Sequence, residues 1–423
     1  MLDRTVAPVW GKIEEAKFPS ALKSLNDIGI PIYHIKAGEQ PVIKIELILE
    51  SGIWHEPIKS ISWFTAKMLA EGTATKSAKQ ISESFEALGA FLEITPGFDD
   101  ISIAVHGLKK NFDQVLILLS EILNESIFPA NELETLKSIR KDQITLNNQK
   151  SNLFASKKLR ECLYGSIYPY GQILETEDVE NITQESVLSF YKNGLFNNAE
   201  IFLSGQVEEE LLKQVKQLLH IPKCQISLDS AIEPNSDQRE IYVERVDSLQ
   251  SSVRLAWCIP NKKEDDYFSY LIANNLLGGY FGSRLMKNIR EEKGYTYGVS
   301  AYPVHLKNSS FGMIASDVKA KHTQDTINEI HMEINRLIHD PIGKEEIETV
   351  TNYMAGAFLS SINTPFQLME KFKNTHSLGL DEKYYQRYFH ALNSITEQDI
   401  KSAMAKYFRI SEAYQVIVGL NKV

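Results

Sequence analysis

Two stretches of the sequence carry the residue types with the clearest potential for chemistry, and the first is LLGGYFGSRLMKNIREEKGYTYGVSAY, residues 276–302. Three glycines lead into a predicted helix with three basic side chains: Gly278, Gly279, Gly282, Arg284, Lys287 and Arg290. A glycine loop before a basic helix can hold an anion. The spacing matches neither a phosphate loop nor a dinucleotide fingerprint. A helix that ends at Gly294 and continues into a strand with Tyr295 and Tyr297 explains the same residues without a ligand. Both interpretations stay open on the residues alone.

The second stretch is SWFTAKMLAEGT, residues 62–73. Its apolar residues have helical spacing and a Gly-Thr pair ends it, yet residues 62–69 contain no His, Cys, Asp or Glu. The ten histidines of the chain include no pair spaced i, i+4, so no helix presents two imidazoles on one face. The sequence therefore predicts no zinc site in this chain.

An internal repeat shows how these stretches are positioned. ELET at residues 132–135 recurs as EIET at 346–349, an offset of 214 residues. ITQESVLSFYKNGLFNNAEIFLSG, residues 182–205, matches ITEQDIKSAMAKYFRISEAYQVIVG, residues 395–419, with one gap. Each copy predicts a helix capped by Thr183 or Thr396, then an apolar strand that ends in glycine.

Earlier parts of the two halves agree in type. QPVIKIELILESG and QSSVRLAWCIPN alternate like strands, and each precedes a helical segment, a second strand (DDISIAVHGL; SSFGMIASDV) and a long amphipathic helix. We predict an α+β protein of two tandem duplicated domains, each an antiparallel-rich sheet with helices packed on one face. The domains are expected at 1–220 and 241–423, joined by a polar, turn-rich linker at 221–240.

The composition of the chain excludes some classes of function and predicts a location. The net charge of −10 argues against nucleic-acid binding and favours basic peptides as ligands. Three cysteines, Cys162, Cys224 and Cys258, are far apart, which indicates reduced thiols and a cytoplasmic location. The sequence contains no run of 18 apolar residues, so no membrane span is predicted. The amino-terminal residues show no signal peptide. A periplasmic location remains open if an export signal has been removed.

Residues 276–302 resemble the signature of the carboxy-terminal half of the M16 family, the pitrilysin-like or inverted zinc peptidases. The family pattern is a glycine-rich loop, Ser-Arg-Leu, Leu-Arg-Glu and Gly-x-x-Tyr. This chain supplies Ser283-Arg284-Leu285, Ile289-Arg290-Glu291 and Gly294-Tyr295-Thr296-Tyr297. With the internal duplication, the resemblance covers essentially the whole chain and implies a fold of the processing-peptidase type.

The resemblance also implies site residues. In the family an Arg and a Tyr seven residues later reach the active site, hold the substrate backbone and stabilise charge at the scissile carbonyl. Arg290 and Tyr297 have that spacing. A guanidinium and a phenol are suitable donors to a carbonyl that becomes an oxyanion. Gly278, Gly279, Gly282 and Arg284 are the expected substrate-binding positions beside them.

The family's zinc motif, His-x-x-Glu-His, is missing. Aligning Gly72-Thr73 with the Gly-Thr that follows the motif places Trp63 and Lys67 at the two His positions and Ala66 at the general base. Counting 76 residues beyond Lys67 gives Gln143 for the third ligand. None of these side chains is a useful zinc ligand or base. Glu93-Ile94 also replace the Asn-Ala that family members carry in a substrate-pairing edge strand.

The resemblance thus implies a non-catalytic, substrate-binding subunit of a heterodimeric metallopeptidase that cleaves peptides or unfolded proteins. Arg290 and Tyr297 would face the zinc site of a homologous partner that carries the intact motif. No cofactor is expected in this chain, and zinc is expected in the partner. The isolated chain is predicted to form a homodimer through the surface meant for the partner. The alternative is an inert scaffold or peptide-binding protein with the same fold.

Overall fold

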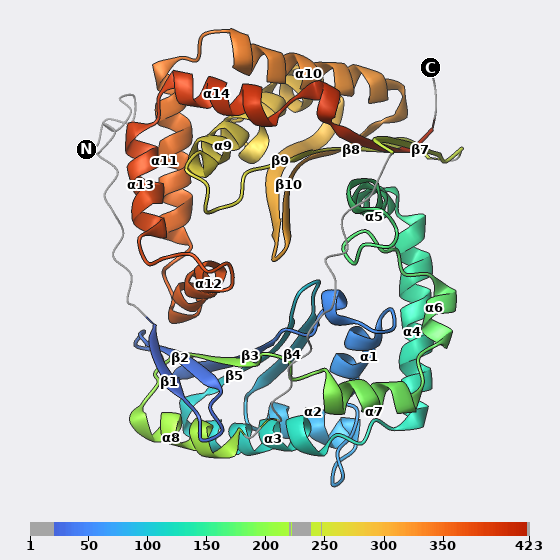
Figure 1. The fold of residues 1–423 in the computed structure, drawn as a ribbon, viewed down its shortest axis with the longest axis vertical. Helices are drawn as coiled ribbons and strands as arrows, with labels where there is room; N and C mark the ends of the chain where they lie inside the picture. The colour runs from blue at the N-terminus through green and yellow to red at the C-terminus, as the bar shows by residue number, and fades with distance from the viewer. Residues whose placement is uncertain (1–20, 220, 222–237, 247, 421–423) are drawn as a thin grey trace, which may run out of the picture.

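The computed structural model describes residues 21–219, 221, 238–246 and 248–420 and contains two sheets (Figure 1). The first has the strand order β1-β2-β6-β3-β5-β4. Its strands are β1 (Leu22–Leu25), β2 (Pro31–Lys36), β3 (Val42–Leu49), β4 (Phe91–Pro96), β5 (Ile101–Leu108) and β6 (Glu200–Gly205). All neighbouring pairs are antiparallel except β2 with β6.

The second sheet repeats this plan with one strand fewer, in the order β7-β11-β8-β10-β9. Its strands are β7 (Glu240–Glu244), β8 (Gln250–Cys258), β9 (Thr296–Leu306), β10 (Ser309–Lys319) and β11 (Tyr414–Gly419). The one parallel pair, β7 with β11, occupies the position of β2 with β6. The predicted duplication and the α+β class are therefore confirmed, and β4 and β9 are corresponding edge strands.

Helices account for most of the remaining described chain. In the first half they are α1 (Ile61–Met68), α2 (Ala78–Ala87), α3 (Phe112–Glu125), α4 (Ala130–Gln149), α5 (Ser151–Tyr164), α6 (Thr176–Glu180), α7 (Gln184–Asn193) and α8 (Glu209–Leu218). In the second half they are α9 (Tyr267–Asn274), α10 (Thr323–His339), α11 (Lys344–Ser360), α12 (Pro365–His376), α13 (Tyr384–Ser394) and α14 (Glu397–Tyr407). Two π-helical segments, η3 (Asn275–Gly279) and η4 (Met286–Glu292), and 3-10 turns at Ile53–His55, Lys109–Asn111, Ala320–His322 and Ile410–Glu412 complete the set.

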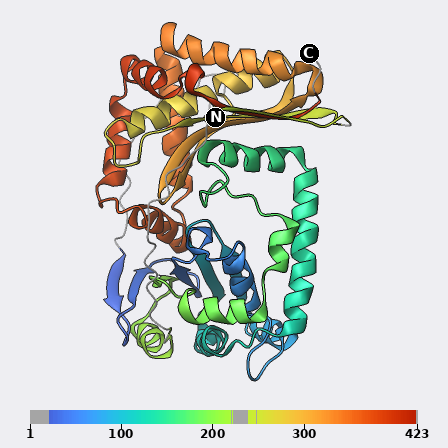
Figure 2. The same cartoon turned by 45° about the vertical axis from the view of Figure 1, so that its right-hand side comes forward.

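Most helices cover the outer faces of the sheets, as the sequence predicted, but each inner face carries one helix from the other half (Figures 1 and 2). Helix α5 of the first half packs on β8 and β11, where Leu159 and Tyr164 join Val416 and Val418 in one core cluster. Helix α12 of the second half packs on β2 and β6. The first residues of α5 and α12, Ser151 and Pro365, are separated by the same 214 positions as the repeated sequence segments. The two exchanged helices are therefore corresponding elements of the duplicated halves.

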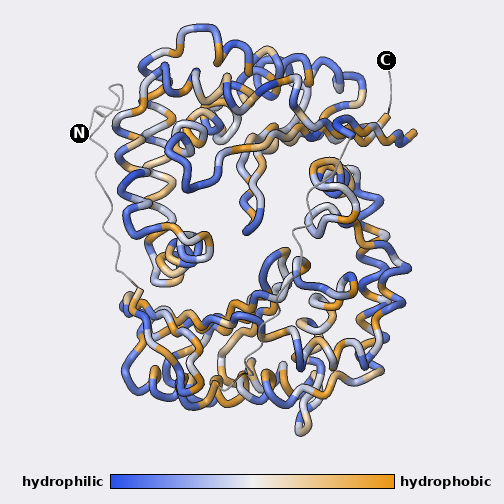
Figure 3. The backbone as a smooth tube through the Cα atoms, in the orientation of Figure 1, coloured by the Kyte–Doolittle hydropathy of each residue, from blue (hydrophilic) through white to orange (hydrophobic). Residues whose placement is uncertain are grey.

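Polar contacts reinforce this exchange. Glu46 of β3 is 5 % exposed and forms ion pairs with Lys44 at 2.7 Å and with Lys373 of α12 at 2.6 Å. Between the sheets the hairpin of β9 and β10 reaches the first half, where Lys307 pairs with Glu50 and its backbone N–H donates to Asp99 at 2.9 Å. Figure 3 shows apolar segments along the strands and a hydrophilic tip on this hairpin. The two halves are thus joined by both apolar and charged contacts.

Several local predictions are confirmed. Thr183 and Thr396 cap α7 and α14 by accepting the N–H of Ser186 and of Asp399. The strands predicted within residues 40–52, 99–108, 250–261 and 309–318 are β3, β5, β8 and β10. The predicted linker at 221–240 lies mostly outside the described residues, as does the amino-terminal segment 1–20. Across the described ranges no helix has both the length and the apolar character that a membrane span requires.

Candidate functional site

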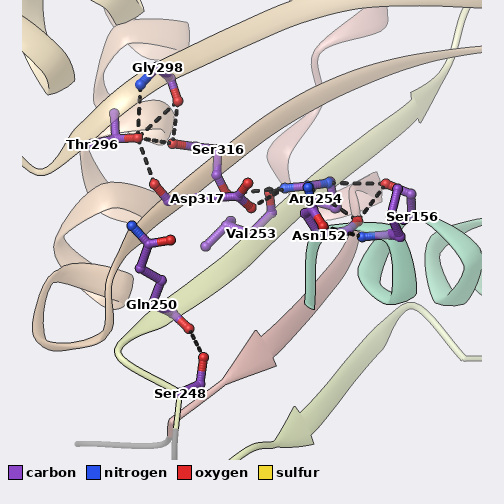
Figure 4. Close-up of polar contacts among 11 residues, drawn as sticks. Asn152, Ser156, Ser248, Gln250, Val253, Arg254, Thr296, Gly298, Ser316 and Asp317 are labelled. Carbon is purple, nitrogen blue, oxygen red and sulfur yellow. Dashed lines mark hydrogen bonds and ion pairs between the residues drawn. The ribbon is translucent and has the colours of Figure 1, made fainter. Parts of the chain in front are cut away.

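Tyr297 lies at the start of the edge strand β9, and the backbone on both sides of it is fixed (Figure 4). The hydroxyl of Thr296 lies 2.7 Å from the carbonyl of Asp317 and accepts the N–H of Gly298 at 3.1 Å. Ser316 donates to the carbonyl of Gly298 at 3.0 Å. The side chain of Tyr297 itself is 91 % exposed. A rigid frame therefore presents a phenol to the surroundings.

Arg290 lies in η4, directly before this strand. Its guanidinium stacks 4.6 Å from the ring centre of Phe281, and in the described part of the chain it contacts this ring rather than a carboxylate. The N–H of Tyr295 donates to the carbonyl of Ile289 at 3.0 Å, which ties η4 to β9. Arg290 and Tyr297 are thus on adjacent, connected elements, and the structure describes no direct contact between their side chains. Both retain free hydrogen-bond donors for an external group.

A pocket of about 500 Å³ lies beside β9. Gly278 and Gly279 of η3, Phe281 and the β9 backbone at Gly298–Ser300 form part of its wall. Arg254 and Asp317, also in the wall, neutralise each other in an ion pair at 3.2 Å. The pocket is therefore formed mainly by small and apolar groups next to the exposed phenol.

The same Arg254 joins the two halves of the chain (Figure 4). It is 6 % exposed and donates to the carbonyl of Ser316 at 3.1 Å and, on α5, to the carbonyl of Asn152 and the hydroxyl of Ser156, both at 3.3 Å. Because α5 belongs to the first half, this contact holds the exchanged helix beside the pocket. Arg254 thus links the position of β10 to that of α5.

The glycine loop has a packing reason as well as the predicted binding role. A Cβ on Gly278 would lie 2.8 Å from the Cβ and 2.9 Å from the backbone nitrogen of Ala301 on β9. A Cβ on Gly279 would meet the side chain of Asn275, and one on Gly282 would meet the ring of Tyr280. Glycine at 278 therefore allows η3 to approach β9 closely.

Gly278→Ala is expected to lower the free energy of unfolding by about 1–3 kcal/mol, the usual cost of overpacking a rigid contact. Denaturant unfolding followed by circular dichroism would measure it. Gly356→Ala is the matched control, because a Cβ there meets nothing within 4 Å and alanine favours the helix. Equal stability of the two variants would show that the approach of η3 to β9 tolerates a side chain.

Arg284 is engaged elsewhere. Its Nε and Nη2 donate to the two carboxylate oxygens of Glu346, both at 2.8 Å, in a partly buried pair. The pair thus connects a residue just before η4 to α11. Such bidentate pairs are strong and geometrically specific. The predicted role of Arg284 in substrate binding remains a prediction, with two of its nitrogens already used by a structural contact.

Helix α1 carries the positions that correspond to the zinc motif. Ala66 is fully buried, and Trp63 stacks under the guanidinium of Arg140 from α4, with 4.3 Å between the ring centre and Cζ. The ammonium of Lys67 donates to the backbone carbonyl of Ile94 on the edge strand β4. Gln143, at the predicted third-ligand position, is exposed on α4. The Arg140–Trp63 stack and the hydrogen bond from Lys67 to the carbonyl of Ile94 therefore occupy the zinc-motif positions of α1.

Glu56, a carboxylate close to the start of α1, caps this helix. Glu56 accepts the backbone N–H of Ser60 at 2.9 Å and that of Ser62 at 3.0 Å, and its burial raises its pKa. It caps a helix end that would otherwise leave these N–H groups unsatisfied. No group of three or more His, Cys, Asp or Glu side chains that could hold a metal ion exists in the described part of the chain. The residues present at the zinc-motif positions do not fit a zinc ion.

Sequence reasoning missed three contributors: Phe281, the Thr296–Ser316 pair and Arg140. Phe281 lies within the predicted glycine loop, and an aromatic residue close in sequence to basic residues is the signal that indicates such a stack. Arg140 precedes Gln143 by three residues and so lies one helical turn away, on a similar face. The hydroxyl pair joins two strands and left no signal in either segment alone.

Two sheets with the same strand plan, each packed against one helix from the other half, define a chain of two duplicated halves. The description Insulinase (Peptidase family M16) matches residues 35–174, and Peptidase M16 inactive domain matches residues 181–354. The chain belongs to peptidase family M16.

Relatives and solved structures agree. The chain is 23 % identical to the uncharacterized zinc protease YmxG of Bacillus subtilis over 89 % of this chain and 92 % of that protein. It is 21 % identical to the non-peptidase homolog YmxG of Helicobacter pylori over 95 % and 94 %. The crystal structure of a peptidase M16 inactive domain from Pseudomonas fluorescens has a TM-score of 0.85 at 23 % identity and covers 95 % of this chain and 99 % of that one. The names of the second and third, a non-peptidase homolog and an inactive domain, fit a non-catalytic member of the family, whereas the first is named a zinc protease.

Two relatives are subunits of assemblies by name. The probable mitochondrial-processing peptidase subunit beta of Schizosaccharomyces pombe is 24 % identical over 51 % of this chain and 49 % of that protein. The mouse cytochrome b-c1 complex subunit 2 is 21 % identical over 77 % and 73 %.

Proposed function

We propose that this chain is the non-catalytic, substrate-binding subunit of a two-chain M16 zinc metallopeptidase that cleaves peptides or unfolded proteins. The partner would be a homologous chain with an intact His-x-x-Glu-His motif. Arg290 and Tyr297 of this chain would reach the partner's zinc site, as the family resemblance implies. Zinc would be held by the partner, because Trp63, Ala66 and Lys67 offer it no ligand.

The observation that carries the proposal is the exposure of Tyr297 on a fixed frame. Tyrosine rings are usually at least partly buried, and a buried tyrosine hydroxyl usually has a hydrogen-bond partner. Tyr297 is 91 % exposed, while the residues before and after it are held by three hydrogen bonds to β10 and to each other. Pre-organised donors of this kind are useful where charge develops during a reaction.

The chemistry of the pair follows from its groups. The guanidinium of Arg290, held flat on Phe281, can donate to a peptide carbonyl of the substrate. The phenol of Tyr297 can donate to the scissile carbonyl, whose oxygen gains negative charge as the tetrahedral intermediate forms. The 500 Å³ pocket beside β9 would take a small or apolar substrate side chain. The partner's metal and general base would activate the attacking water.

Two further parts of the proposal concern assembly and location. The named subunits among the relatives support a partner of the same fold, and without it the isolated chain would pair with itself through the same surface. Two free cysteines in the described residues, buried Cys162 and exposed Cys258, support a reducing compartment such as the cytoplasm.

Reconstitution tests the proposal. The genome of the source organism is searched for an M16 chain with the intact motif, and the two chains are purified separately and mixed. Cleavage of an unfolded protein is expected only from the mixture. If no mixture with such a chain cleaves anything, the peptidase-subunit assignment is wrong. The scaffold alternative, which the cytochrome b-c1 relative supports, would then be the better account.

A further inference from the structure

Four basic side chains lie on three neighbouring helices, two of which, α1 and α4, carry the positions that correspond to the zinc motif. They are Lys67 of α1, Arg140 of α4, and Lys157 and Arg160 of α5, and together we call them the basic strip. All four are partly buried. Within the described residues none of them forms an ion pair with a carboxylate, although the chain as a whole is acidic. Such a concentration of unpaired positive charge requires an explanation.

The two arginines are held in place by rings, and most of their donors remain unused. Arg140 lies 4.3 Å above Trp63, and Arg160 lies 5.1 Å above Phe98. The Nε of each is buried and has no acceptor among the described residues. Arg160 donates once through Nη1, to the carbonyl of Ser156 at 3.3 Å. A stacked guanidinium with free donors is already ordered for a planar, bidentate acceptor such as a carboxylate.

The two lysines complete the strip. Lys67 donates to the carbonyl of Ile94, and Lys157 donates to the side-chain oxygen of Asn148 at 2.8 Å. Each ammonium carries three donors and uses one of them in these contacts, so two remain on each.

Nearby carboxylates compensate these charges only in part. Through space, the charge of Glu56 favours the protonated form of Arg140, that of Glu93 favours protonated Lys67, and that of Glu175 favours protonated Lys157. Glu56 is already occupied by the backbone N–H groups of α1. Burial lowers the pKa of all four basic groups, and Arg140 lowers the pKa of both lysines further. The strip therefore gains stability from an added negative charge.

We propose that the basic strip is a binding site for the carboxylates of a peptide, formed where the family's metal site has been lost. Arg140 would hold one carboxylate through its free nitrogens. Lys67 and Lys157, whose pKa values the charge of Arg140 lowers, and Arg160, whose charge lowers that of Lys157, would supply further donors. The carboxylates could come from Asp and Glu side chains or from the carboxy terminus of the peptide. The inference goes beyond the proposed function and does not depend on a catalytic partner, because the isolated chain contains the whole strip.

Fluorescence anisotropy with three labelled decapeptides tests this on the full chain alone at low salt. The first contains four Glu and an amidated terminus, the second has Gln in their place and a free terminus, and the third has Gln and an amidated terminus. We expect one or both carboxylate-bearing peptides to bind about tenfold more tightly than the neutral one, since charged hydrogen bonds provide at least that factor. Preference for the first peptide identifies side chains as the source, and preference for the second identifies the terminus. Equal binding of all three would overturn the proposal.

Variants locate the binding. Arg140→Met is expected to weaken the preferred peptide about tenfold, while Arg140→Lys, which keeps the charge, should retain part of the affinity. Lys79→Met is the matched control, because it removes the same charge from an 83 % exposed side chain on α2. An effect of Arg140→Met no greater than that of Lys79→Met would contradict the assignment. Circular dichroism confirms that each variant is folded. Arg160→Met tests the part of the basic strip on α5 by the same binding measurement.

Discussion

Tyr297→Phe is expected to slow cleavage by the reconstituted two-chain peptidase by about 2–4 kcal/mol in activation free energy, roughly 30- to 1000-fold. The substitution removes one hydroxyl and leaves the ring. Since Tyr297 is almost fully exposed, the fold loses little with the hydroxyl. The phenol would act mainly after charge develops on the carbonyl oxygen, so the loss should fall on kcat more than on KM. Arg290→Ala should cost a similar amount and also raise KM, because it removes a contact to the substrate backbone.

A control on the same strand separates this effect from damage to β9. Tyr302→Phe makes the same chemical change, on a side chain that is 38 % exposed. Its kcat and KM are expected to match those of the unmodified chain. If Tyr302→Phe and Tyr297→Phe reduce the rate equally, or if neither changes it, Tyr297 has no role in the reaction.

Glu46→Gln is expected to destabilise the fold by about 3 kcal/mol. Burial alone would raise the pKa of Glu46, but Lys373 and Lys44 outweigh burial and lower the pKa from 4.5 to about 2. Because this pKa is lower in the folded than in the unfolded chain, the carboxylate stabilises the fold above pH 4.5. That contribution is lost as the pH falls from about 4.5 to about 2. A shift of this size corresponds to about 3 kcal/mol, and the variant also leaves two lysines without their buried partner.

Urea unfolding of the variant at pH 7 and pH 3 measures both effects. At pH 7 the difference from the unmodified chain should be largest, and at pH 3 it should shrink. Glu370→Gln is the control, since its carboxylate contacts the same lysines at a 46 % exposed position, where an ion pair contributes about 1 kcal/mol or less. If Glu46→Gln is no worse than Glu370→Gln, the buried contact does not hold α12 on the first sheet.

The strands and capped helices were predictable because their signals are local. Alternation along residues 42–49 and 250–258 indicates a strand, and a Thr three residues before a polar side chain indicates a helix start. The exchange of α5 and α12 could not be predicted in this way. An apolar helix face shows that something covers it, without saying whether that partner comes from its own half or the other. The repeat relates α5 to α12, so it indicates that the two helices pack in the same way. It does not indicate that each packs on the sheet of the other half.

Within the candidate site, residues from one continuous segment were also predictable, and residues brought together by long-range contacts were not. Gly278, Arg290 and Tyr297 lie within one continuous segment, so their types and spacing were visible in the sequence. Arg140 was not, because its contact with Trp63 joins residues 77 positions apart. The net charge of −10 suggested basic ligands, whereas the basic strip favours acidic ones. Net charge averages over the surface, while a binding site depends on the few groups that face it.

The zinc content of the purified chain tests the central claim most directly. The chain is dialysed against trace zinc, analysed for metal and assayed alone for cleavage of an unfolded protein. With Trp63, Ala66 and Lys67 in place of the metal ligands and base, we expect far less than one zinc per chain and no cleavage. One tightly bound zinc per chain, or cleavage by the chain alone that a chelator abolishes, would contradict the account.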